Sequence, residues 1–242
     1  DYHATTPCDP LVLDAMLPWF SRDFGNASSR QHAYGWKAAE AVKQAREAVA
    51  ALVGAEPEEI IFTSGATESV NLAIKGAAEM LASKGRHIIT VQTEHSVVLD
   101  TCRRLETAGY EITRLGVDGQ GLLSLQELSD AIRPDTILVA VMMANNETGV
   151  IQDMTAISAI TREKGVWLFS DATQAVGKTR VDVKDPAIDM MAFSAHKFYG
   201  PKGMGALYLR RRNPRVRIMP LIDGGGHERG LRSGTLNVPL IV

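Results

Sequence analysis

The chain has 242 residues, of which 45% are hydrophobic and 22% charged, a balance typical of a folded globular protein. Its 26 basic and 28 acidic residues give a formal net charge of -2, which argues against nucleic acid as a direct partner, since polyanion-binding proteins carry a basic excess. No apolar run approaches the ~20 residues that cross a membrane, and two cysteines are too few for a disulfide framework, so we expect a cytoplasmic protein.

The chain alternates between predicted helices and strands. An amphipathic helix over residues 35–53 ends at Gly54, a residue typical of helix C-termini. The other helices are predicted from residues 64–68 to about 81, and over 97–108, 124–132 and 154–164. Strands are predicted over residues 59–63, 87–91, 110–115, 136–142, 166–170, 190–194 and 205–209. Because helices separate the strands, we expect right-handed crossovers and an α/β fold whose mostly parallel sheet is flanked by helices.

The two ends of the chain carry few signals. Residues 1–7 contain neither a starting methionine nor a secretion signal. Residues 237–242 are mainly apolar and show no capping or turn signal, so we expect the complete protein to continue beyond them. A run of arginines at residues 210–212, with Arg215 and Arg217, is interpreted as a solvated face.

The first polar cluster lies where the strand over 59–63 meets the next helix. Gly65 permits a tight turn, and the amides of Ala66 and Thr67 would be unpaired donors at the helix start. The Thr67 hydroxyl adds a donor, so this segment could hold a phosphate. A capping box that pairs Ser or Thr with Glu68 explains the same residues equally well.

Three further clusters follow predicted strands, where ligands bind in open α/β sheets. His95 could stack on a planar ring and exchange protons, although a structural histidine is the simpler interpretation of this residue alone. Asn145 and Asn146 could bind a ligand or form a turn. Asp171 follows a buried strand and needs a cationic partner, such as the protonated pyridine nitrogen of pyridoxal phosphate, or it caps the next segment.

The segment over residues 193–203 contains one lysine between Ser-Ala-His and a glycine-rich turn. A pyridoxal phosphate enzyme needs a rigidly held lysine for a Schiff base with the cofactor, and Lys197 stands in such a place. Ser194 and His196 could reach the cofactor phosphate from the same loop. A surface loop is the alternative. Residues 224–235, with three successive glycines, could bind phosphate or form a mobile loop, but they are no Walker A motif.

In this order, the segments resemble those of the cysteine desulfurases, within the class V aminotransferase group of fold-type I pyridoxal phosphate enzymes. The resemblance covers nearly all 242 residues, and its last segment is similar to the housekeeping and nitrogen-fixation branch. Its carriers are residues 1–7, 26–29, His32, 63–68, 93–95, 145–149, 171–174, 194–197 and 226–235. It implies the large cofactor-binding domain over residues 15–242, with residues 1–14 packed on a C-terminal small domain that this chain lacks.

The resemblance also implies a role for each matched residue. Lys197 would form the Schiff base, Asp171 would pair with the pyridine nitrogen, and His95 would stack on the ring and move protons. The remaining cofactor-binding residues would be Gln174 and Asn146 at the ring oxygen, and Ala66, Thr67, Ser194 and His196 at the phosphate. Ala4 and Thr5 would line the substrate side, and Thr235 would reach the phosphate of the neighbouring subunit in a homodimer with shared sites. No metal site is expected.

The implied reaction converts L-cysteine to L-alanine and passes the sulfur to an enzyme cysteine as a persulfide. The sulfur would then reach an iron–sulfur scaffold or an acceptor for tRNA thiolation. In the family, the nucleophilic cysteine and the arginine for the substrate carboxylate lie beyond the position of Thr235, so this chain alone is expected to bind the cofactor without completing the reaction. Cys8 and Cys102 do not match the nucleophile motif and are interpreted as small structural residues.

Three alternatives remain open from the sequence. Another class V enzyme, such as a small amino-acid transaminase or a selenocysteine lyase, would share Lys197 and Asp171. A non-catalytic scaffold could have kept the fold without the chemistry. A nucleotide-binding Rossmann protein is a weaker alternative, because no Gly-x-Gly-x-x-Gly follows the first strand.

Overall fold

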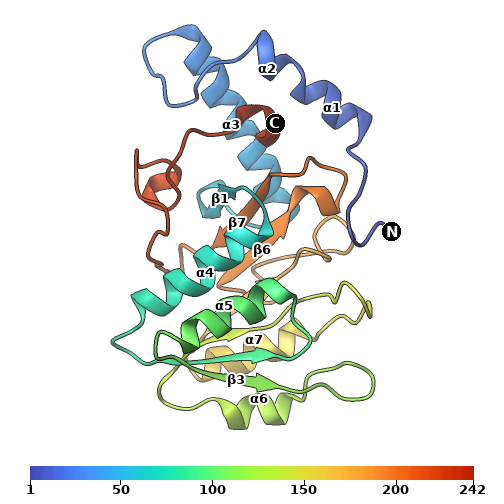
Figure 1. The fold of residues 1–242 in the computed structure, drawn as a ribbon, viewed down its shortest axis with the longest axis vertical. Helices are drawn as coiled ribbons and strands as arrows, with labels where there is room; N and C mark the ends of the chain where they lie inside the picture. Colours follow the sequence, from blue (N-terminus) through green and yellow to red (C-terminus); the bar gives the residue numbers. More distant parts are fainter.

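In the computed structural model, which describes residues 1–242, seven strands form one sheet (Figure 1). Across the sheet the strands are β1 (Ile60–Thr63), β7 (Gly205–Leu209), β6 (Met190–Ser194), β5 (Trp167–Asp171), β4 (Thr136–Ala140), β2 (His87–Val91) and β3 (Glu111–Leu115). Only β7 runs antiparallel to its neighbours, β1 and β6. The predicted mostly parallel sheet is therefore confirmed, and the other six strands point their carboxyl ends the same way.

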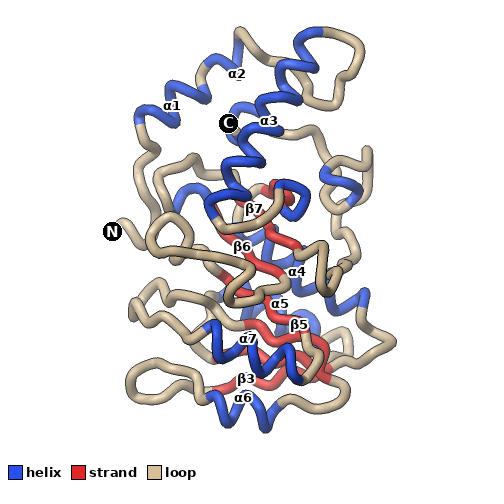
Figure 2. The backbone as a smooth tube through the Cα atoms, turned by 180° about the vertical axis from the view of Figure 1, so that it is seen from behind, coloured by secondary structure: helices blue, strands red, loops and turns tan.

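Helices cover both faces of this sheet. The long ones are α3 (Ala33–Leu52), α4 (Ala66–Met80), α5 (Ser96–Glu106) and α7 (Met154–Glu163). The short ones are α1 (Pro10–Met16), α2 (Pro18–Ser21), α6 (Leu125–Ala131) and α8 (Val238–Ile241), with 3₁₀ turns η1 (Pro57–Glu59), η2 (Ala195–Lys197) and η3 (Glu228–Gly230). Helices α4 and α5 lie in front of the sheet in Figure 1, and α7 lies on the opposite side, which Figure 2 shows from behind.

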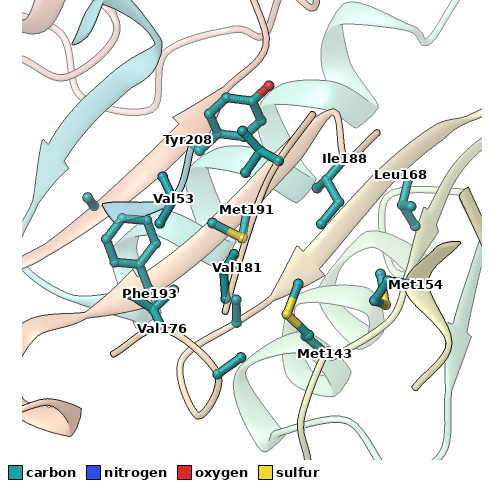
Figure 3. Close-up of a cluster of buried hydrophobic side chains, with 14 of the residues drawn as sticks. Val53, Met143, Met154, Leu168, Val176, Val181, Ile188, Met191, Phe193 and Tyr208 are labelled. Atoms are coloured by element: carbon teal, nitrogen blue, oxygen red, sulfur yellow. The ribbon is translucent and has the colours of Figure 1, made fainter. Parts of the chain in front are cut away.

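Two hydrophobic cores follow from this layering. Alternate residues of a strand point to opposite faces, so Ile88 packs in the core under α4 and α5, whereas Ile89 packs in the core on the side of α3 and α7. The second of these cores includes Met191, Phe193 and Tyr208, which lie near Val53 at the end of α3 (Figure 3). The central strands β4, β5 and β6 are buried almost throughout, so they fix the points from which the loops at their carboxyl ends begin.

Each helix and strand predicted from the sequence is present, with ends that differ by a few residues. One difference affects the site, because β5 extends to Asp171 and makes that residue the last of the strand rather than the first of the loop. The interpretation of residues 210–212 as a solvated face is wrong for Arg210. This side chain is buried, and its Nε lies 3.4 Å from Oδ1 of Asp189.

Helices α1, α2 and α8 were not predicted from the sequence. The expectation that residues 237–242 carry no capping signal is wrong, because α8 has an N-cap. The side chain of Asn237 accepts a hydrogen bond from the amide of Leu240 at 3.4 Å, and Pro239 stands in the first turn. Helix α8 contacts α2 and α3, so the last helix of the chain packs against helices from its N-terminal part (Figure 2). None of the helices combines the length and the apolarity needed to span a membrane.

Candidate active site

A cavity of about 900 Å³ lies at the carboxyl ends of the strands. It gathers side chains from the segments that follow β1, β2, β4, β5 and β6, because strands that point the same way end at the same edge of the sheet. The predicted site residues among those that line it are Ala4, Ala66, Thr67, His95, Asn146, Asp171, Gln174, Ser194, His196 and Lys197. Two predicted residues, Thr5 and Thr235, do not line it.

Asp171 forms a buried acidic wall of the cavity. Its residue surface is 3% exposed, and the amide of Thr173 donates a hydrogen bond to its Oδ1 at 2.9 Å. Burial raises the pKa of its carboxyl, while hydrogen bonding from Thr173 and the charges of His95 and Lys197 oppose that shift. A buried carboxyl of this kind is stabilised as the carboxylate by a cation in the cavity.

Lys197 lies across the cavity in η2, directly after β6. Its ammonium donates hydrogen bonds to the backbone oxygens of His3 at 2.6 Å and Ala4 at 2.9 Å. Burial lowers the pKa of Lys197, and the nearby charge of Lys178 lowers it further, whereas Asp171 opposes the shift. A lowered pKa increases the fraction of neutral amine, which is the nucleophilic form.

The N-terminal segment holds the loop of Lys197 in place. The amide of Thr6 donates to the backbone oxygen of His196 at 2.9 Å, and the Thr6 hydroxyl accepts from the amide of Tyr199 at 2.7 Å. The Thr5 hydroxyl lies 3.0 Å from Nδ1 of His196. Thr5 therefore contacts the wall of the cavity from behind, instead of lining the cavity as Ala4 does.

The start of α4 offers unpaired donors to the cavity. Its N-cap residue is Gly65, which has a φ of +146° and makes no side-chain cap, so the first amides of the helix have no side-chain acceptor. Only half of the alternative capping box is present: Glu68 accepts from the amide of Ser64 at 2.8 Å, but no Ser or Thr side chain caps the first amides of α4 in return. Glu68 also accepts from Nε of Arg232 at 2.8 Å. Thr67 lines the same cavity and adds a hydroxyl, and these donors suit a phosphate. Ser194 also lines the cavity, but its hydroxyl donates to the backbone oxygen of Met204 at 3.3 Å.

His95 has a structural role and also lines the cavity, so both interpretations from the sequence remain compatible with its position. Its Nδ1 accepts a hydrogen bond from the amide of Val97 at 3.2 Å, which makes His95 the N-cap of α5. Its side chain also lines the cavity. Because Nδ1 accepts, the neutral ring carries its proton on Nε2.

The amide side chains also divide between structural and cavity positions. Asn145 forms a turn, since its Oδ1 accepts from the amides of Glu147 and Thr148 at 2.9 Å each. The side chain of Asn146 lines the cavity. Gln174 is buried there and donates from Nε2 to the backbone oxygen of His3 at 2.8 Å.

Sequence reasoning missed three residues that contact this site. Lys178 donates a hydrogen bond to Oε1 of Gln174, and its position four residues later in the same segment was the available signal. The backbone of His3 accepts from both Gln174 and Lys197, a contact that no local pattern could indicate. Glu94 is buried behind His95, although an acidic residue in a loop is usually exposed.

Neither cysteine is placed in the structure as a nucleophile of this cavity would be. Cys102 is buried in α5, and burial raises the pKa of its thiol to about 12. It therefore stays a thiol at neutral pH, and the thiolate is the reactive form. Cys8 does not line the cavity.

Together these residues fit pyridoxal phosphate. One cavity presents uncapped amides and the Thr67 hydroxyl for a phosphate, a buried carboxyl for a protonated ring nitrogen, and a lysine of lowered pKa for an aldehyde. No group of metal-binding side chains with suitable geometry is present.

Comparison with known proteins supports this interpretation. The chain is 59% identical over 242 residues to cysteine desulfurase IscS of Anaeromyxobacter sp. (strain Fw109-5), and 58% identical to that of Methylococcus capsulatus. Each match covers 100% of this chain and 60% of the relative, so the chain spans well under two thirds of these curated proteins.

Solved structures agree with the sequence relatives. "SspA in complex with cysteine" superposes with a TM-score of 0.95 at 47% identity, over 100% of this chain and 69% of that one. A "NifS-like protein" gives 0.96 at 43% identity, over 100% and 66%. The fold-type I architecture and the resemblance to cysteine desulfurases are thus confirmed, and such enzymes use pyridoxal phosphate. The sequence model for aminotransferase class-V matches residues 1–242, and the chain therefore belongs to that family.

Proposed function

We propose that the protein containing this chain is a cysteine desulfurase, which converts L-cysteine to L-alanine and transfers the sulfur to an enzyme cysteine as a persulfide. The observation that carries this proposal is that Lys197 and Asp171 line one cavity together with the uncapped start of α4. A solved relative described as a complex with cysteine supports the choice of substrate.

Different residues of the chain would bind different parts of the cofactor. When bound, pyridoxal phosphate withdraws electrons from the substrate and makes its Cα proton more acidic. Lys197 would bind the cofactor through Nζ, Asp171 would hold its ring nitrogen in the charged form, and Gln174 would orient its ring through Nε2. His95 would lie against the ring and move a proton through Nε2, which its cap to Val97 leaves available.

The phosphate end and the substrate end of the cavity have different walls. The amides of Ala66 and Thr67 would bind the phosphate, together with the side chains of Ser194 and His196. Asn146 would contact the ring oxygen, and the Ala4 segment would border the substrate with Thr5 behind it.

We also propose that the enzyme is a cytoplasmic homodimer with shared sites. Thr235 is exposed, and its loop is tied to the start of α4 because Nε of Arg232 donates to Glu68 at 2.8 Å. The loop can therefore present Thr235 to the phosphate of a neighbouring subunit. Residues 1–14 would pack on a C-terminal domain of the complete protein, and the sulfur would pass to an iron–sulfur scaffold or a tRNA-thiolation protein.

The decisive experiment incubates the full-length protein with L-cysteine and a thiol reductant, which releases the persulfide sulfur as sulfide, and should yield alanine and sulfide in equal amounts. Lys197→Ala should abolish this activity and the yellow, borohydride-reducible cofactor. Lys164→Ala, which changes an exposed lysine after α7, is the matched control and should keep both. Amino transfer that depends on a keto acid, or activity confined to L-selenocysteine, would support a different class V enzyme, and a colourless protein would support a scaffold.

A further inference from the structure

A second carboxyl group is buried beside the cavity, and the proposed reaction gives it no role. Glu94 directly precedes His95, and its residue surface is 7% exposed. Its Oε1 accepts a hydrogen bond from the amide of Met142 at 2.6 Å. Its Oε2 is buried without a hydrogen-bond partner, and no ion pair involves Glu94. An ionised carboxylate in such a place would be strongly destabilised.

The charged and titratable groups near Glu94 favour its neutral form. Asp171 approaches from β5 and Cys102 from α5, and neither supplies a positive charge. His95 follows in the chain, with Nδ1 occupied by the amide of Val97. Burial raises the pKa of Glu94 well above its usual value, and the negative charge of Asp171 raises it further, although the Met142 amide opposes both.

Two buried carboxyls near one another rarely both ionise. Asp171 has hydrogen bonding from Thr173 and the positive charges of His95 and Lys197 to stabilise its anion. Glu94 has only the amide of Met142. Of the two carboxyls, Glu94 is therefore the one that keeps its proton, and Asp171 is the one that carries the negative charge.

A small cavity with mainly apolar walls borders Glu94 and has room for a water molecule. It measures about 90 Å³, whereas a water molecule occupies roughly 30 Å³ in the liquid. Besides apolar side chains, its walls include the polar residues Thr93, Glu94, Asn145, Thr148 and Gln152. A water there would accept from Oε2–H and bond to a second polar wall group, which satisfies the atom that the protein leaves unpaired.

We propose that Glu94 is a neutral carboxylic acid that binds a buried water and positions His95. Its carbonyl oxygen accepts from Met142, and its hydroxyl donates to the water, so it ties the segment of His95 to the chain after β4. Nδ2 of Asn145 reinforces this tie by donating to the backbone oxygen of Thr93 at 2.9 Å. Only the effect on His95 rests on the proposed function.

The first test is infrared spectroscopy on the full-length protein with its cofactor at neutral pH. The wild type should show the carbonyl-stretch band of a protonated carboxylic acid, and Glu94→Gln should lack it. Identical spectra would overturn the assignment. This result does not depend on turnover, so inactivity towards L-cysteine would count against the proposed function while leaving the protonation of Glu94 testable.

The second test separates positioning from simple packing. Glu94→Gln keeps a carbonyl and a donor, whereas Glu94→Met keeps the length and loses both. Glu94→Met should lower kcat about tenfold with little change in KM and should change the NMR chemical shifts of the His95 ring, because that ring is no longer fixed. Glu94→Gln should keep the wild-type chemical shifts. If Glu94→Met does not fold, a Glu94→Gln protein with altered His95 chemical shifts would still contradict the proposal.

The third measurement concerns pH and stability. Because the pKa of Glu94 is raised in the folded state, its contribution to stability is complete below the ordinary value of about 4.3 and is lost as pH rises towards the folded value. The denaturation midpoint of Glu94→Gln, relative to the wild type, should therefore increase from pH ~4 upwards. A difference that is constant with pH would mean that Glu94 does not hold its proton.

Discussion

Arg46 and Glu228 form a two-point ion pair between helix α3 and the glycine-rich loop near the chain's C-terminal end. The two guanidinium contacts measure 2.6 and 2.8 Å, and the side chains are 13% and 2% exposed. Glu228 also accepts from the amide of Phe62 at 2.8 Å, so one carboxylate joins α3, β1 and the loop. Of the two interpretations of residues 224–235, a freely mobile loop is therefore disfavoured at Glu228.

Arg46→Ala should reduce the free energy of unfolding by about 3–5 kcal/mol, since it leaves the Glu228 carboxylate buried without its partner. Denaturant unfolding of the full-length protein measures this loss. Lys43→Ala is the control, because its contacts with Glu40 and Glu47 are exposed and 3.9 Å long. That change should alter stability by less than about 1 kcal/mol. Equal effects of the two substitutions would mean that the ion pair does not anchor the loop.

Asp171→Asn should impair turnover far more than folding. The substitution removes the negative charge that the proposed function assigns to the cofactor's ring nitrogen, so kcat should fall on the order of a hundredfold or more. Stability should stay unchanged or rise, because burial already raises the pKa of this carboxyl and disfavours its ionised form. Steady-state kinetics and denaturant unfolding measure the two effects.

Asp189→Asn provides the matched control for this prediction. Asp189 is also buried with a raised pKa, but it pairs with Arg210 at 3.4 Å and does not line the cavity. Its substitution should lower stability and leave the kcat of the folded fraction near the wild-type value. If Asp171→Asn turned over L-cysteine normally, Asp171 would not be the partner of the ring nitrogen.

Gly205 determines how closely β7 approaches the start of α4. A Cβ atom at this residue would lie 2.6 Å from Cα of Gly65 and 2.8 Å from the backbone oxygen of Phe193, and backbone atoms cannot move aside cheaply. Gly205→Ala should therefore lower stability by about 2 kcal/mol or more and weaken cofactor binding by displacing α4. Gly116→Ala, where no atom lies within 4 Å, should be nearly neutral. Thermal unfolding with and without added cofactor tests both variants.

The sequence was sufficient to predict the framework of the site. Buried strands leave continuous apolar runs, so the ends of β2, β6 and β7 could be identified closely. Because most of the strands are parallel, the polar residues at or after their carboxyl ends lie at one edge of the sheet. This arrangement places Asp171 and Lys197 in one cavity. Helices α1 and α2 escaped prediction because seven and four residues are too few for a clear periodicity.

Long-range polar contacts were beyond such reasoning. The backbone oxygens of His3 and Ala4 accept hydrogen bonds from Lys197, which is 194 and 193 residues later in the sequence. Every residue has a backbone oxygen, so the sequence does not indicate which ones make such contacts. The burial of Glu94 could not be predicted from the sequence either, because a charged residue in a loop is usually exposed. Most of the site residues predicted from the sequence line the cavity, whereas their hydrogen-bond partners required the fold.

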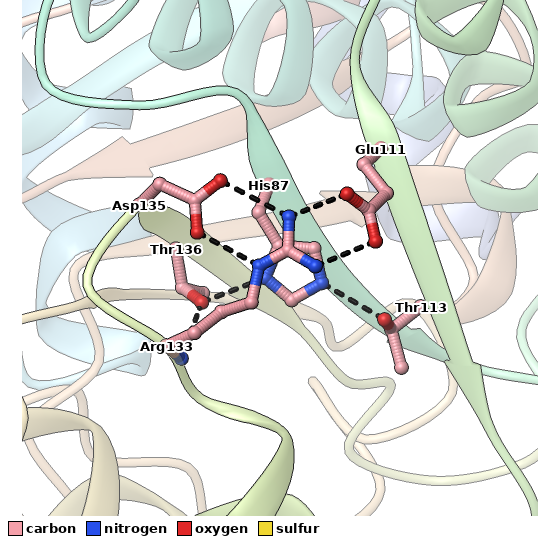
Figure 4. Close-up of polar contacts among 6 residues, drawn as sticks. All are labelled: His87, Glu111, Thr113, Arg133, Asp135 and Thr136. Carbon is pink, nitrogen blue, oxygen red and sulfur yellow. Dashed lines mark hydrogen bonds and ion pairs between the residues drawn. The ribbon is translucent and has the colours of Figure 1, made fainter.

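A buried histidine should make the fold sensitive to acid. His87 is fully buried, and its Nδ1 and Nε2 lie 2.7 and 2.8 Å from the hydroxyls of Thr136 and Thr113 (Figure 4). Arg133 lies over this ring and binds both Glu111 and Asp135. Burial lowers the pKa of His87, the charge of Arg133 lowers it further, and the two carboxylates oppose the shift.

The direction of the pH effect follows from that lowered pKa. The contribution of His87 to stability is complete above its unfolded pKa of about 6.5 and is lost as pH falls through that value towards the folded one. The wild type should therefore lose up to about 1.4 kcal/mol per pH unit in this window, and His87→Gln should lack this dependence. Unfolding free energies measured at several pH values test it, with His32→Gln, an exposed histidine, as the control that keeps the slope. An unchanged slope in His87→Gln would assign the acid sensitivity to other groups.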